Sequence, residues 1–119
     1  MVSCIFNADS ALEEGVPCYP QHLMEWSGKT YASVFRRLFG EQVPPNVGSF
    51  SLRENDYVLG EHKFGGNAQA ISKDRFVHHT SLLWIYQHEN MKLLQHPLLA
   101  PEYRKGREHT AFVCALRFL

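Results

Sequence analysis

The chain has 119 residues, which is enough for one compact domain and leaves little room for a second. Twelve Lys and Arg residues balance twelve Asp and Glu residues, so no overall field draws the chain toward nucleic acid or an anionic membrane surface. With 45% hydrophobic and 20% charged residues the composition is that of a globular protein, and no apolar run reaches the ~20 residues that span a bilayer.

The three cysteines, Cys4, Cys18 and Cys114, stand far apart and lack the paired spacing of a zinc knuckle or a redox dithiol. Their odd number and wide separation favour free thiols in a reducing, intracellular compartment. Residues 1–7 carry neither a basic n-region nor an Arg-rich amphipathic stretch, so they do not indicate a signal or transit peptide. The choice between cytoplasm, mitochondrion and plastid stays open.

The first part of the chain predicts a strand, a loop and a long helix. Residues 2–7 form a short apolar, β-branched run typical of a buried strand, and the Gly- and Pro-containing residues 9–20 predict a surface loop. Apolar side chains recur every three or four positions over residues 21–39, which predicts an amphipathic helix that ends at Gly40. Residues 41–48 contain tandem prolines and predict a connector.

The second part predicts an antiparallel meander followed by short helical pieces. Apolar and β-branched runs separated by turn residues predict four strands, at residues 50–53, 57–59, 64–71 and 76–86. We further expect one or two helical turns at residues 90–95, a loop at 97–107 and a C-terminal helix at 110–119.

The segment from Asn55 to Gln69 contains the residues best suited to chemistry. Lys63 is a compact cation that can reach a phosphate or a developing carboxylate oxygen. The adjacent Gly65 and Gly66 lack side chains, so their backbone can approach a ligand in conformations closed to other residues. Asp56 offers a carboxylate for Mg²⁺.

A structural interpretation of the same residues also stays open, and on spacing alone it is the commoner one. A Gly-Gly pair after a strand is typical of a bulge or a hairpin bend, and a lone lysine is typical of a solvated surface. The segment has neither the Walker A spacing nor a G-x-G-x-x-G fingerprint.

A family resemblance favours the chemical interpretation. Residues 55–68 read Asn-Asp, then Gly-x-x-Lys-x-x-Gly-Asn-Ala, and residues 76–83 contain His-His-x-x-Leu-Leu. In order and spacing these motifs resemble the signature of the lipoate-protein ligase A family. The tail at residues 100–104, with Arg107 and His109, also resembles plant-type members of the family.

The resemblance implies a fold and a boundary. It implies an α/β domain of α+β type, with a mixed or antiparallel sheet and flanking helices, of the biotin and lipoate ligase fold that is related to class II aminoacyl-tRNA synthetases. Residues 1–119 would form a single, partial catalytic domain. Family members carry an Arg-Arg and Gly-Gly-Gly motif ahead of the strand that residues 2–7 resemble, so we expect the acyl-binding wall and several strands to be absent and sheet edges to be exposed.

The resemblance also implies an activity with its cofactors and partners. Such enzymes use ATP and Mg²⁺ to convert lipoate into lipoyl-adenylate. They then pass the acyl group to a lysine of an acyl carrier domain, of the kind found in glycine cleavage H protein and in the E2 component of 2-oxoacid dehydrogenases.

Site residues are carried over only where this sequence matches the motif. Lys63 matches the lysine that contacts the acyl carbonyl and the adenylate phosphate, where its charge stabilises developing negative charge. The remaining matches are Asn55 and Asp56 near phosphate and metal, Gly65, Gly66, Asn67 and Ala68 around the adenylate, and His79 and Thr80 on the strand that borders the acyl pocket.

Two other features are expected to be structural. Adjacent residues on a strand point to opposite faces, so His78 and His79 are not expected to share a metal ion, and one of them should face inward. Cys114 lies in an apolar stretch that raises a thiol pKa and keeps it inert, although octanoyltransferases of related fold use a cysteine nucleophile.

Three functions therefore remain open. The first is an ATP-dependent lipoate or octanoate ligase. The second is a non-catalytic remnant that binds a nucleotide weakly or a partner chain through an open sheet edge. The third is octanoyl transfer from a carrier protein without ATP, which release of pyrophosphate would distinguish from the first.

Overall fold

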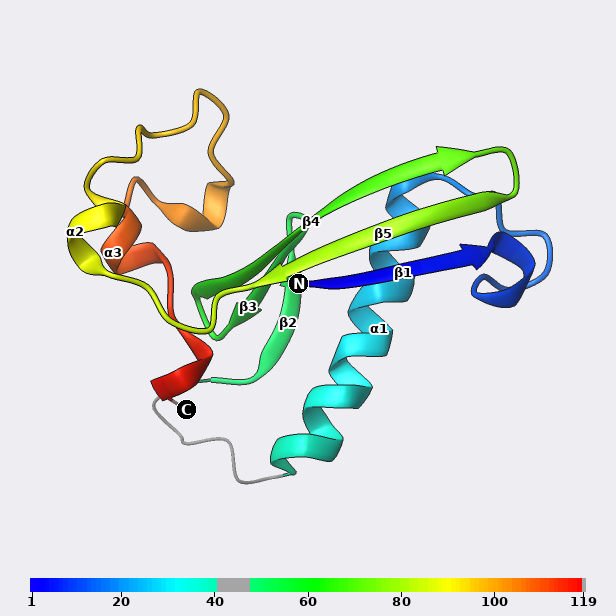
Figure 1. Ribbon diagram of the computed structural model, residues 1–119, viewed down its shortest axis with the longest axis horizontal. Coiled ribbons are helices and arrows are strands. Elements are labelled where there is room, and N and C mark those ends of the chain that lie inside the picture. The colour runs from blue at the N-terminus through cyan, green and yellow to red at the C-terminus, as the bar shows by residue number, and fades with distance from the viewer. Residues whose placement is uncertain (41–47, 119) are drawn as a thin grey trace.

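The computed structural model describes residues 1–40 and 48–118, which form a five-stranded antiparallel sheet with flanking helices (Figure 1). The strand order is β1-β5-β4-β3-β2, so four consecutive strands form a meander and the N-terminal strand pairs with the last of them. This confirms the expected class and selects the antiparallel sheet over the mixed one. The strands are β1 (Val2–Asn7), β2 (Phe50–Arg53), β3 (Asp56–Leu59), β4 (His62–Ser72) and β5 (Arg75–Leu82).

Two-residue turns join the strands of the meander at the predicted places. Glu54 and Asn55, between β2 and β3, have φ values of 45° and 73°, the left-handed pair of a type I′ turn whose twist matches that of the flanking strands. Gly60 and Lys73 supply the positive φ in the next two turns. Local turn chemistry thus sets the register of the meander.

The long helix α1 (Pro20–Phe39) covers part of one sheet face. Proline occupies its first position and Gly40, with φ 58°, ends it, so the predicted helix is confirmed with a start one residue earlier. A Cβ on Gly28 would lie 3.2 Å from Cδ2 of Leu52, so the helix approaches β2 closely at this glycine. The core on this face is built from Met24, Phe35, Tyr57, Leu59 and Phe64.

Part of the opposite face, around β3, is covered by the C-terminal part of the chain. Val58 alternates with Tyr57 and Leu59 along β3, so its side chain points away from α1. There it packs in a second buried cluster with Tyr103 and Phe112. No helix within the described ranges is long and apolar enough to cross a membrane.

Short helices mark the remaining described segments. They are η1 (Ala8–Ser10) in the predicted first loop, α2 (His88–Met91) in place of the helical turns predicted at 90–95, and η2 (Glu102–Arg104) in the predicted second loop. The predicted connector lies, except for Gly48, outside the described residues.

Two predictions at the C-terminal side are wrong. Strand β5 ends at Leu82 rather than at residue 86, because the carbonyls of Leu83 and Trp84 accept hydrogen bonds from the backbone of Leu116 and Arg117 instead of from a strand. The helix predicted at 110–119 is a single turn, α3 (His109–Phe112), followed by extended backbone and η3 (Leu116–Phe118). The turn stops because Cys114 donates its N–H to the carbonyl of Lys63.

Candidate functional site

An ion pair between Lys63 and Asp56 lies at the centre of the candidate site. Asp56 begins β3 and Lys63 is the second residue of β4, so the hairpin brings them together. Lys63 Nζ lies 2.6 Å from Asp56 Oδ1, and the hydroxyl of Tyr103 donates to Asp56 Oδ2 at 2.8 Å. Both carboxylate oxygens are therefore engaged, and the carboxylate fixes the position of the ammonium group.

Tyr103 is a permanent hydrogen-bond donor to this carboxylate. Burial of the phenol raises its pKa, and the hydrogen bond to Asp56 and the charge of that carboxylate raise the pKa further. The phenol therefore keeps its proton at any physiological pH, and the contact does not switch with pH.

A β-bulge shapes the backbone beside Lys63. Val58 pairs with Lys63 while the preceding Tyr57 pairs with Gly65, so Phe64 is the extra residue on β4. The bulge considered from the sequence is thus present next to the two glycines.

The two glycines have different structural roles. Both have ordinary strand conformations without positive φ, so the expectation of a backbone closed to other residues is wrong. A Cβ on Gly65 would lie 3.0 Å from Leu82 Cδ2 and 3.1 Å from the carbonyl of Ser81, so close packing of β4 on β5 requires glycine there. A Cβ on Gly66 would meet only Cε and Nζ of Lys63, both at 3.7 Å, so the lysine side chain passes over Gly66.

A cavity of about 490 Å³ opens beside Lys63. Its walls come from the bulged part of β4, the end of β5 and the segments around α2 and α3. Among the residues that the structure describes, the basic residues of the lining are Lys63, Arg104 and His109, and no Asp or Glu lines the cavity. Most of the rest is apolar, including Phe64, Leu82, Leu83, Met91, Leu94 and Phe112. The cavity therefore suits a ligand with an anionic group and an apolar part.

A second cavity, of about 690 Å³, is lined by three further residues of the signature. It lies between the first turns of α1 and β4, and its lining includes Asn55, Asn67 and Ala68. Asn67 Nδ2 donates to the backbone carbonyl of Asn55 at 2.7 Å, and this hydrogen bond fixes the Asn67 side chain against the turn after β2. The expected nucleotide-binding residues are consequently divided: Lys63, Gly65 and Gly66 line the first cavity, and Asn55, Asn67 and Ala68 line the second.

His79 and Thr80 line neither of these two cavities. His79 is exposed, and its Nδ1 lies 2.7 Å from the hydroxyl of Ser3 on the neighbouring strand β1. Thr80 is fully buried in the sheet.

His78 is the inward-facing member of the histidine pair and belongs to a buried polar chain. Its Nε2 lies 2.9 Å from Tyr57 Oη, which lies 2.7 Å from Ser27 Oγ, and Gln69 Nε2 lies 3.3 Å from His78 Nδ1. The Ser27 hydroxyl donates its proton to the carbonyl of Met24, so it accepts from the Tyr57 hydroxyl. The Tyr57 hydroxyl in turn accepts from Nε2–H of His78. Burial lowers the pKa of His78, and His79 lowers it further. Through Tyr57 and Ser27, the neutral imidazole of His78 thus connects β5 to α1 by hydrogen bonds.

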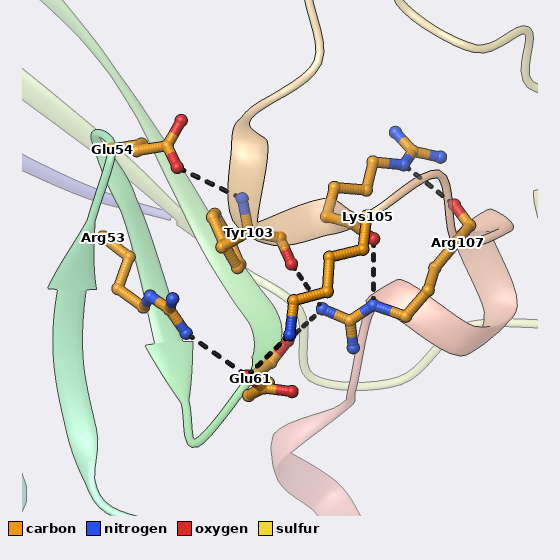
Figure 2. Close-up of polar contacts among 7 residues, drawn as sticks. Arg53, Glu54, Glu61, Tyr103, Lys105 and Arg107 are labelled. Atoms are coloured by element: carbon orange, nitrogen blue, oxygen red, sulfur yellow. Dashed lines mark hydrogen bonds and ion pairs between the residues drawn. The ribbon is translucent and has the colours of Figure 1, made fainter.

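The segment that contains Tyr103 is held by two hairpin turns, as Figure 2 shows. The Glu54 carboxylate accepts the backbone N–H groups of Glu102 and Tyr103 at 2.9 and 3.2 Å. Arg107 donates from Nη2 to the carbonyl of Glu61 at 2.8 Å and to that of Tyr103 at 3.0 Å. The turns after β2 and β3 therefore position Tyr103, which contacts Asp56.

These roles were not predictable from the sequence, which indicates a loop at residues 97–107 and no contact for Tyr103 or Arg104. The available indication was the Tyr-Arg pair followed by Arg107 and His109, which the resemblance to plant-type members had already picked out.

Cys114 has the inert environment that the sequence predicts. Burial raises the pKa of its thiol. The sulfur lies 3.7 Å from the carbonyl of His62, to which it donates, and this contact favours the protonated thiol.

Within the described residues, one group of side chains has the spacing of metal ligands. The ligand atoms of His96, Glu108 and His109 all lie within 4.8 Å of one another, and His96 Nε2 lies 3.1 Å from Glu108 Oε2. His96 and Glu108 are exposed, and an ion pair explains their contact when His96 is protonated.

Comparison with known proteins identifies the family of the chain. Residues 2–116 match the lipoyl protein ligase A/B catalytic domain, and the chain belongs to that family. It is similar to a Plasmodium falciparum protein described as inactive lipoate–protein ligase 2, with 28% identity over 88% of this chain. The aligned region covers 33% of that relative, so the chain spans about a third of its length. No solved structure matches the chain.

Proposed function

We propose that this chain takes part in ATP-dependent protein lipoylation, as the part of a lipoate–protein ligase that binds the activated acyl group. The observation that carries the proposal is the position of Lys63. Its ammonium is held by Asp56 at the wall of a cavity whose described lining has two further basic residues, no acidic residue and a largely apolar surface. An acyl-adenylate combines the apolar chain and the anionic group that such a cavity suits.

The proposed reaction has two steps. A carboxylate oxygen of lipoate or octanoate attacks the α-phosphorus of ATP, a new P–O bond forms, and pyrophosphate leaves. The amine of a lysine on an acyl carrier domain then attacks the acyl carbonyl, the amide forms, the amine proton is released and AMP leaves. In both steps negative charge develops on oxygens that Lys63 stabilises from a fixed position.

The described geometry does not offer Asp56 as a free Mg²⁺ ligand. One of its oxygens contacts Lys63 and the other accepts from Tyr103, so a metal ion bound there would compete with at least one of these contacts. In the proposal Asp56 positions Lys63, Mg²⁺ enters with the phosphates of ATP, and no step depends on a metal site of this chain.

Substitution of Lys63 tests the proposal. The chain is incubated with octanoate or lipoate and ATP labelled at the α-phosphate, and acyl-AMP and pyrophosphate are measured. We expect Lys63→Ala to lower acyl-AMP formation by at least about a hundredfold, the loss typical of one electrostatic group in the transition state. Lys29→Ala, at an exposed position of α1, is the matched control. Equal product from wild type and Lys63→Ala would remove Lys63 from the mechanism.

A second candidate function is a non-catalytic, partner-binding role. It is favoured by the word inactive in the name of the Plasmodium relative, and by β1, which pairs with a strand on one side only. Ile5 and Val2 on that strand are 75% and 40% exposed. Acyl-AMP formation by the wild-type chain would exclude this alternative, and its absence would favour it.

Octanoyl transfer without ATP has no support at Cys114, whose thiol is protonated and donates to a backbone carbonyl. Pyrophosphate release in the same assay separates the two reactions, because only the adenylating reaction produces it.

A further inference from the structure

The cavity beside Lys63 contains a second cation, and its charge is buried. Arg104 is 3% exposed and lines the cavity. Its Nε donates to the carbonyl of Arg107 at 2.9 Å, but its Nη2 is buried without a hydrogen-bond partner. Among the residues that the structure describes, no carboxylate lies within 4.0 Å of this guanidinium. A buried charge is normally paired, because desolvation without a partner is strongly unfavourable.

The surroundings of Arg104 add positive charge. Its guanidinium lies 4.9 Å from the ring centroid of Phe112, and the guanidinium of Arg107 lies 5.4 Å from the same centroid. The ring attracts both cations, but the cations repel each other. Burial lowers the pKa of His109 in the same cavity, and the charge of Arg104 lowers it further. An anion would relieve this accumulation of positive charge.

Lys63 and Arg104 differ in their need for a counter-ion. Asp56 neutralises Lys63 at 2.6 Å and leaves its position fixed. Arg104 has no such partner in the described residues and is the more completely buried of the two, since the Lys63 side chain is 34% exposed. A ligand oxyanion would therefore offset more unfavourable desolvation at Arg104 than at Lys63.

We propose that Arg104 binds the oxyanion, phosphate or carboxylate, of an amphipathic ligand whose apolar part packs against Phe64, Leu82 and the other apolar residues of this cavity. The inference rests on the proposed function and deepens it, because it assigns the acyl-adenylate a second cation from the C-terminal segment. Lys63 and Arg104 then hold the ligand from two walls, one formed by β4 and the other by η2.

Binding of AMP and of octanoate to the whole chain tests the proposal without requiring turnover. Affinity is measured by titration calorimetry, and the midpoint of thermal unfolding is recorded with and without each compound. The variant is Arg104→Met, which keeps the length of the side chain and removes the charge. Arg37→Met, at an exposed position of α1, is the matched control.

We expect Arg104→Met to bind at least one of the two compounds about tenfold more weakly than wild type or worse, the effect of losing one charged hydrogen bond. Without ligand its unfolding midpoint should equal or exceed that of wild type, because an uncompensated buried charge has been removed. Loss with AMP identifies phosphate as the oxyanion, and loss with octanoate identifies carboxylate. Arg37→Met should behave as wild type.

The proposal is overturned if Arg104→Met binds both compounds as wild type does, or if the wild-type chain binds neither. Should Arg104→Met fail to fold, Arg104→Gln, which removes the charge but keeps hydrogen-bonding groups, gives the decisive comparison: weaker binding supports the proposal, and unchanged binding overturns it. These outcomes are distinct from failure of the proposed function, which is read from acyl-AMP formation in Lys63→Ala.

Discussion

The hydroxyl of Tyr103 donates a hydrogen bond of 2.8 Å to Asp56, the residue that holds the ammonium of Lys63. The contact joins the C-terminal segment to the hairpin of β3 and β4. The position of the lysine thus depends on a residue far from it in the sequence.

Tyr103→Phe should therefore affect both stability and activity. Loss of one hydrogen bond to a partly buried carboxylate should lower the free energy of unfolding by about 1.5–3 kcal/mol, as measured by urea titration. It should also lower the rate of acyl-AMP formation more than it raises the KM for ATP, because Lys63 loses orientation rather than charge. Tyr19→Phe, at an exposed tyrosine, serves as the control. A stable variant with unchanged rate would show that Asp56 needs no second contact.

The two neighbouring glycines should respond differently to alanine. In Gly65→Ala the new methyl group meets Leu82 Cδ2 at 3.0 Å and the Ser81 carbonyl at 3.1 Å, so we expect a loss of about 1–3 kcal/mol in the free energy of unfolding. Gly66→Ala meets only the end of Lys63 at 3.7 Å, so its stability should be unchanged or raised by up to about 1 kcal/mol. Equal destabilisation of the two variants would contradict the packing described for β4 and β5.

His78 should make stability fall in mild acid. Its pKa in the folded state is lowered from the ordinary value of 6.5, so below about pH 6.5 the unfolded chain binds a proton that the folded chain does not. This contribution to stability is present above that pH and is lost as the pH falls, at up to about 1.4 kcal/mol per pH unit until the folded-state pKa is reached.

Unfolding midpoints of wild type and His78→Gln between pH 8 and pH 5 measure this effect. Glutamine keeps a donor and an acceptor in the buried chain but does not titrate, and His109, whose pKa is also lowered, is common to both proteins. The variant should lose less stability than wild type across the range. Parallel curves would show that His78 does not contribute.

Glu54 should control the order of the C-terminal segment. Its carboxylate accepts the backbone N–H groups of Glu102 and Tyr103, so Glu54→Ala should speed hydrogen exchange at these two amides by about tenfold, which corresponds to the loss of one hydrogen bond. Glu14→Ala, at an exposed position in the first loop, should leave their exchange unchanged. If Glu54→Ala also leaves it unchanged, other contacts hold the segment.

The meander was predictable because its determinants are local. The turn residues around Asn55, Gly60 and Lys73 adopt positive φ where the sequence places the turns, and the strand periodicity between them is short and regular. The same hairpin brings Asp56 and Lys63 together, so the centre of the candidate site was accessible from the sequence.

The C-terminal structure was not predictable in this way. Residues 110–119 have a loose apolar alternation, but their conformation is decided by backbone partners at Lys63, Leu83 and Trp84. For the same reason the sequence indicated that His78 and His79 face opposite ways without indicating which is buried. That choice depends on Tyr57, Ser27 and Trp26, which lie on the side of α1.

Residues 102–114 are ordered by their contacts with the hairpin of β3 and β4. Ligand binding in the cavity and the ordering of these residues therefore affect each other by the same free energy. A ligand that contacts Arg104 favours conformations in which η2 is docked, and whatever docks η2 raises affinity by the same factor. A protein that binds the outer surface of residues 102–114 would therefore change the affinity of the cavity for its ligand without entering the cavity.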